Sequence, residues 1–131
     1  MVEPGKRYQA IAIETASPGQ LILMLFDGAL RFMAAAVAAF EETERTKRIE
    51  SIHNNLSRAQ SILRELQTSL DQEKGGEFSQ RMHPLYEFMI EQLNDANLKK
   101  DVKPVQIVES LLRQIRDAWA QMLVQPSTKG A

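Results

Sequence analysis

Residues 49–70 read IESIHNNLSRAQSILRELQTSL, and their pattern of apolar residues indicates the fold class. These apolar residues are spaced alternately by three and four positions: Ile49, Ile52, Leu56, Ala59, Leu63, Leu66 and Leu70. This spacing places them on one face of an α-helix and is the heptad pattern of a helix-bundle seam. We expect the helix to end at Lys74-Gly75-Gly76, because a lysine suits a helix C-terminus and glycine readily adopts positive φ.

The segment before this stretch contains a clear helix start. Ser17 can cap the helix with its hydroxyl, Pro18 suits the first helical position, and Gln20 completes a capping box. We expect this helix to extend to about Glu42. Its predicted core stripe consists of Ile22, Phe26, Ala29, Met33, Ala36 and Phe40.

Two further segments follow with the helical period. The apolar positions of the third are Phe78, Met82, Leu85, Met89, Leu93 and Ala96. Pro84 either kinks this helix or marks its start at His83, because proline removes one helical hydrogen bond. Residues 98–103 are a short polar connection with Asp101 as a candidate cap. The last helix then ends before Pro126, and its predicted core positions are Val105, Val108, Leu112, Ile115, Trp119 and Met122.

These patterns predict an all-α fold. Short loops make neighbouring helices antiparallel, which favours an up-and-down four-helix bundle over residues 17–125. An N-terminal arm or short helix is expected in residues 1–16 and a disordered tail in residues 126–131. The 131 residues suit one domain with a single core, and no run of useful length alternates with the period of a strand.

The composition excludes several classes of protein. The net charge is −1, so the chain lacks the basic surface that nucleic-acid binding requires. The absence of cysteine excludes disulfides and thiolate metal sites and suits a reducing cytosol. There is no signal-peptide core, and the most apolar run, Leu21 to Phe26, is far shorter than the roughly 20 residues of a membrane-spanning helix. We expect a soluble cytoplasmic protein without membrane insertion.

The signals for an enzyme are weak. Glu50 and His53 have the Glu-x-x-His spacing of di-iron carboxylate bundles, but such sites need two of these motifs, and His83 is preceded at that spacing by Gln80. Both Glu50 and His53 are also expected on the solvent side of their helix. No nucleophile with a matching base, phosphate-binding loop or zinc spacing is present. We therefore expect no catalysis, no cofactor and no metal.

The first helix is more apolar than its core face requires. Its flanking apolar residues are Leu21, Leu25 and Phe32 on one side and Leu23, Leu30 and Val37 on the other. Together they span roughly 200°, against the ≳ 100° stripe of an ordinary surface helix. Three explanations stay open: burial beneath neighbouring helices and the N-terminal arm, a homodimer interface, or a groove for an amphipathic helix.

Several ordered blocks resemble the flagellin export chaperones, the FliS family. They are TASPGQLILMLFDGA at residues 15–29, LDQEKGGE at 70–77, LYEFMI at 85–90, LNDAN at 93–97 and Ala118-Trp119. The resemblance covers residues 8–122, and its first block is the most specific. Phe26 stands where many members have tyrosine, and Pro84 departs from the more regular helix usual at that position.

The resemblance implies an antiparallel four-helix bundle that acts as a chaperone in the bacterial cytosol. Its members bind the disordered C-terminal segment of new flagellin, which wraps around the bundle and becomes helical in its grooves. This capture prevents premature polymerisation and keeps flagellin competent for flagellar type III export. The apolar burial must exceed the cost of ordering the segment.

Candidate contact residues follow from the resemblance and the periodicity together. Tyr8 matches an N-terminal tyrosine that resembles a plug on the empty bundle, while Asp27 and Arg31 could form a polar rim. The full partner-binding set is Tyr8, Ile11, Leu21, Leu25, Asp27, Arg31, Phe32, Tyr86, Ile90, Ile107 and Leu111. Each apolar member could equally belong to the core.

The sequence is compatible with other partners and other functions. Export-gate components, flagellin-linked regulators and a co-chaperone are compatible with the resemblance, and we expect a monomer or a weak homodimer. A helical regulatory adaptor that holds a different flagellar or secretion protein is the second functional hypothesis. A bundle enzyme with a carboxylate metal site is the third.

Overall fold

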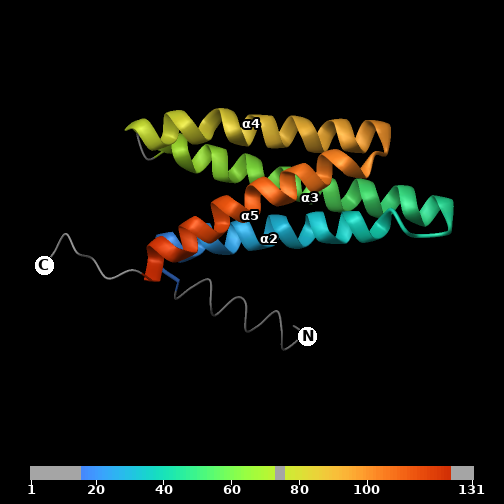
Figure 1. Cartoon of the computed structure of the whole chain (residues 1–131), viewed down its shortest axis with the longest axis horizontal. Coiled ribbons are helices and arrows are strands. Elements are labelled where there is room, and N and C mark those ends of the chain that lie inside the picture. The colour runs from blue at the N-terminus through green and yellow to red at the C-terminus, as the bar shows by residue number, and fades with distance from the viewer. Residues whose placement is uncertain (1–15, 73–75, 125–131) are drawn as a thin grey trace, which may run out of the picture.

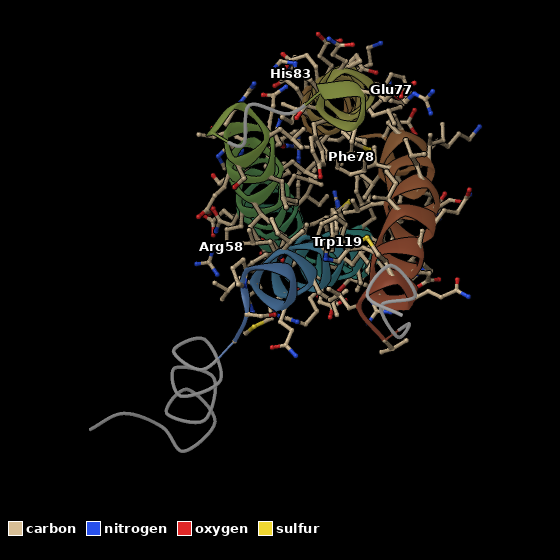
Figure 2. All side chains as sticks on the ribbon, turned by 90° about the vertical axis from the view of Figure 1, so that its left-hand side faces the viewer. Arg58, Glu77, Phe78, His83 and Trp119 are labelled. Carbon is tan, nitrogen blue, oxygen red and sulfur yellow. The ribbon has the colours of Figure 1, made fainter. Side chains whose placement is uncertain are left out.

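The computed structural model describes residues 16–72 and 76–124, which form four α-helices (Figure 1). These are α2 (Pro18–Ala39), α3 (Arg45–Gln72), α4 (Gly76–Lys99) and α5 (Val102–Val124). Successive helices run in opposite directions, and each packs against its two neighbours in a ring that α5 closes against α2 (Figure 2). The predicted all-α antiparallel bundle is confirmed. The predicted arm and tail lie outside the described residues, apart from Ala16.

The predicted start of α2 is confirmed by its capping geometry. The Ser17 hydroxyl accepts a hydrogen bond from the backbone N–H of Gln20 at 3.2 Å, and the Gln20 side-chain oxygen accepts one from the backbone N–H of Ser17 at 3.0 Å. These two bonds satisfy donors that the first helical turn leaves without partners. At its other end α2 stops at Ala39, with Phe40 as C-cap, so it is shorter than the predicted helix ending near Glu42.

Pro84 lies inside α4, so the alternative that the helix starts at His83 is wrong. The helix begins at Gly76, whose positive φ of 32° suits a residue without a side chain. Beside the proline, Gln67 of α3 donates to the carbonyl of His83 at 3.3 Å and to the carboxylate of Glu87 at 2.9 Å. Packing against α3 therefore holds α4 in one piece despite the missing backbone donor.

The connection between α4 and α5 is shorter than the predicted residues 98–103. Helix α4 continues to Lys99 and α5 begins at Val102, which leaves two residues for the turn. Lys100 adopts the left-handed conformation with φ 52°. The Asp101 carboxylate accepts a hydrogen bond from the backbone N–H of Lys103 at 3.0 Å, which confirms the predicted cap.

All four helices contribute to one hydrophobic core. Its completely covered side chains include Met33, Leu56, Leu63, Met89, Leu93 and Leu112. Three predicted core positions are wrong: Ile49 is 38% exposed, Phe78 54% and Met122 51%. Each lies close to an end of its helix, where fewer neighbouring side chains remain to cover it.

Within the described parts of the chain, α2 is the one helix whose length and apolar composition would suffice to cross a bilayer. The bundle accounts for much of this apolarity, because Phe26 and Met33 are core residues and Leu30 is 6% exposed. Helix α2 packs against both α3 and α5. A helix with two such neighbours needs a wider apolar face than a helix on the surface.

Candidate functional site

One apolar flank of α2 faces α3. Leu21, Leu25 and Phe32 are half-buried there rather than fully covered. The guanidinium carbon of Arg58 on α3 lies 5.5 Å from the centre of the Phe32 ring, a cation–π geometry. The sequence did not predict this contact, because no local signal links Arg58 to a ring on another helix.

Beyond Phe32 this flank is hollowed where the side chains become small. A shallow depression of about 460 Å³ is lined by Ala35, Ala38, Ala39, Glu42, Lys47, Ser51 and Asn55. Asn55 turns its amide back to the carbonyl of Ser51 at 2.8 Å. The small alanines of α2 and the polar residues of α3 thus form a groove with a mixed lining.

The other flank of α2 faces α5 and includes charged side chains beside its apolar residues. The Asp27 carboxylate lies 2.7 Å from the Arg116 guanidinium, which also contacts Asp117 at 3.2 Å. These hydrogen bonds raise the pKa of Arg116 above its ordinary value, and the bond with Asp27 contributes most. A second depression of about 370 Å³ here is lined by Asp27, Leu30, Arg31, Ala34, Arg113, Arg116 and Asp117.

The predicted contact residues of α2 are therefore divided between two surfaces. Leu21, Leu25 and Phe32 lie on the side of α3, whereas Asp27 pairs with α5 and Arg31 lines the depression between α2 and α5. The structure does not bring them together into one rimmed groove. Of the opposite flank, Leu30 is buried and Val37 is half-buried, so ordinary packing explains part of the apolar surplus.

Two candidates on α4 point into the bundle. Tyr86 is 2% exposed and Ile90 7%, which places both in the core. Burial raises the pKa of the Tyr86 hydroxyl above its ordinary range. In this conformation neither side chain offers appreciable surface to a partner.

The seam between α4 and α5 carries the remaining candidates. Ile107 is 53% exposed and Leu111 is half-buried. Phe88, which the sequence reasoning did not select, is 42% exposed on α4. Its position three residues after Leu85 and one before the core residue Met89 could have identified it as an apolar side chain off the core stripe.

At the end of the bundle that contains Trp119, a hydrogen bond and a ring contact hold α5 against α2. The Trp119 indole N–H donates to the carbonyl of Gly19 at 2.8 Å, and its ring meets Phe26 edge-on with the ring centres 6.3 Å apart. The ring centre of Phe78 on α4 lies 6.2 Å from that of Trp119; both side chains are labelled in Figure 2. At Gly19 a Cβ atom would lie 2.7 Å from Leu123, so the absence of a side chain allows α5 to approach.

Within the described residues no group of three or more histidine, cysteine or acidic side chains is arranged to hold a metal ion. Glu50 and His53 are both exposed, as predicted. His53 instead lies 2.9 Å from the Asn97 amide on α4. The arm residues Tyr8 and Ile11 are outside the described part of the chain.

Comparison with known proteins gives a consistent match. Residues 1–126 match the sequence model of the family described as flagellar protein FliS. The flagellar secretion chaperone FliS of Salmonella typhimurium is 39% identical over 122 residues, which cover 89% of this chain and 87% of that protein. That of Bacillus subtilis is 36% identical over 120 residues (92% and 86%), and that of Escherichia coli 38% over 117 residues (88% and 83%).

Proposed function

The chain belongs to the FliS family of flagellar secretion chaperones, and we propose that its cargo is flagellin, held by the C-terminal segment until export. In this proposal the chaperone works in the bacterial cytosol. It prevents flagellin from polymerising early and delivers it in a form that the type III export apparatus accepts.

The observation that carries the proposal is exposed apolar surface on a finished bundle. The core is closed, and no buried side-chain nitrogen or oxygen in the described residues lacks a hydrogen-bond partner. Yet Phe78, Phe88, Ile107 and Met122 are each 42–54% exposed. Large apolar side chains left exposed on two neighbouring helices support a binding surface for another chain.

A rigid bundle suits a disordered cargo. A segment that folds on binding pays for its own ordering, which costs about 2–5 kcal/mol or more of the gross interaction energy. The receptor should therefore lose little freedom itself. The hydrogen bond from Trp119 to Gly19 and the capping box at Ser17 hold the ends of α2 and α5 in place before any partner arrives.

We assign the half-buried residues Leu21, Leu25 and Phe32 to the contact surface for the segment. Their outer edges are accessible between α2 and α3, where a helix of the cargo could cover them. Asp27 and Arg31 would then border a separate polar contact beside α5. The arm with Tyr8 and Ile11 is proposed to cover this surface when cargo is absent, and an export-gate component or a co-chaperone is a candidate further partner.

A chaperone family is not a class of enzymes, and we propose that this protein has no catalytic activity. Glu50 and His53 lie on the exposed face of α3 without further acidic partners in the described chain that would complete a metal site. Metal analysis of protein purified without chelators tests this point, since a stoichiometric transition metal would contradict it.

The proposed function is tested by mixing the full chain with a synthetic peptide of the flagellin C-terminal segment. We expect saturable heat of binding and a gain of helix by circular dichroism beyond the sum of the two components. A peptide of the same composition in scrambled order is the control. Absence of binding, or binding without added helix, would overturn the proposal.

A further inference from the structure

Two arginines from different helices line one open depression, and neither is paired with a carboxylate. Arg31 of α2 and Arg113 of α5 both line the depression of about 370 Å³ between these helices, and both are exposed. We propose that this depression docks an acidic segment of a second protein, distinct from the cargo, whose carboxylates pair with Arg31 and Arg113. The inference goes beyond the proposed function and does not depend on the identity of the cargo.

The acidic side chains of the depression are already engaged. Asp27 and Asp117 both contact Arg116, at 2.7 and 3.2 Å, and the pair with Asp27 joins α2 to α5. In the described part of the chain, no ion pair or side-chain hydrogen bond includes Arg31 or Arg113. Their guanidinium donors are therefore available to a ligand, while the Asp27–Arg116 pair holds the two sides of the depression together.

One further acidic residue lies beside Arg113 on α5. Glu109 precedes it by one helical turn and is half-buried. Burial raises the pKa of the Glu109 carboxyl, and the charge of Arg113 opposes that rise. The two side chains form no ion pair, so Glu109 does not occupy the donors of Arg113.

The lining of the depression determines which anion fits it. Leu30 and Ala34 of α2 add apolar surface to the same depression. A free phosphate ion could use the guanidiniums but would gain nothing from this apolar surface. A peptide in which leucine is flanked by glutamates can use both, because each guanidinium presents a planar fork of donors that matches a carboxylate. The chemistry therefore favours a segment with alternating acidic and apolar side chains.

The depression lies apart from the surface assigned to the cargo. Leu21, Leu25 and Phe32 flank α2 on the side of α3, whereas the depression lies on the side of α5. An acidic partner can therefore dock on the chaperone whether or not the cargo surface is occupied.

The probe is a capped peptide of four Glu-Glu-Leu repeats, and the same peptide with glutamine in place of glutamate is its control. Binding to the full chain is followed by NMR through the arginine Nε–H signals, which report each guanidinium separately. Arg31→Gln and Arg113→Gln are combined in one variant, and since both positions are exposed, the bundle should still fold. Arg45→Gln, at an exposed position of α3 outside the depression, is the matched control. Circular dichroism checks the fold of each variant.

We expect saturable shifts of the Arg31 and Arg113 signals with the glutamate peptide. The double variant should raise the dissociation constant about fivefold or more and Arg45→Gln less than about twofold, because each exposed pair contributes modestly and the two act together. Added salt should weaken binding, since it screens exposed charges.

Three results would overturn the inference: no saturable binding of the glutamate peptide, equal shifts with the glutamine peptide, or unchanged affinity in the double variant. Displacement of the probe by the flagellin C-terminal peptide would also overturn it, because the depression would then belong to the cargo surface.

Discussion

Replacing Trp119 with phenylalanine should loosen the end of the bundle where α5 meets α2. The substitution removes the indole N–H that donates to the Gly19 carbonyl at 2.8 Å and reduces the contact with Phe26 and Phe78. The Gly19 carbonyl keeps its place in the hydrogen-bond ladder of α2, so it is not left without a partner. Trp119 is half-buried, so part of its surface contributes nothing to stability.

The expected magnitude follows from these contacts. Loss of the hydrogen bond costs about 1 kcal/mol. The smaller ring costs about 0.5–1 kcal/mol more through lost apolar contact. Together the free energy of unfolding should fall by about 1.5–2 kcal/mol, a large part of the stability of a small domain.

Urea denaturation followed by far-UV circular dichroism is the appropriate assay, because the substitution removes the sole tryptophan and its fluorescence. Met122→Ala, at a 51% exposed position one turn along α5, serves as control and should change stability by less than about 0.5 kcal/mol. A Trp119→Phe variant within that same margin would refute the reasoning. An equal loss in the control would show that α5 frays regardless of Trp119.

Three further predictions concern the core, acid stability and the arm. Leu63→Ala, at a position with no exposed surface, should cost about 2–5 kcal/mol in urea denaturation, whereas Ser61→Ala on the outer face should stay within about 0.5 kcal/mol. The amide of Gln67, with help from Arg64, lowers the pKa of Glu87, so its stabilising effect is present above the ordinary glutamate pKa and is lost as the pH falls through the lowered value. Glu87→Gln should therefore flatten the acid side of the stability–pH curve, and parallel curves would contradict this. If the arm competes with the cargo as proposed, Tyr8→Ala should leave the affinity for flagellin peptide unchanged or raise it; a large loss with the fold intact would place the arm in the binding surface.

The helical period predicted the core better than it predicted the surface. Between Ile52 and Leu70 every predicted core position is buried, because the direction of each side chain follows from its place on the helix. The prediction that Ile49 is buried is wrong because periodicity does not indicate where the neighbouring helices end. Tyr86 and Ile90 lie outside the predicted core stripe of α4. Both are buried nevertheless, because the inward face of α4 is wider than that stripe.

The candidate site includes contacts between helices that no local sequence pattern predicts. Arg116 and Asp27 are 89 positions apart, and their ion pair forms only when α5 packs on α2. The ring of Phe32 meets Arg58 for the same reason. Pro84 was a local signal for a break, yet α4 is continuous there, and Gln67 of α3 donates hydrogen bonds to the His83 carbonyl and the Glu87 carboxylate beside it.

The hydrogen bond between Trp119 and Gly19 joins residues that are 100 positions apart in the chain. During synthesis, α2 therefore leaves the ribosome long before the helix that closes over it. At about 5–20 residues per second, this interval lasts on the order of 5–20 seconds. Throughout it, the side of Phe26 and Met33 that packs inward in the finished bundle is still open to other chains. A secretion chaperone of this family thus passes through a vulnerable period of its own before its bundle is closed.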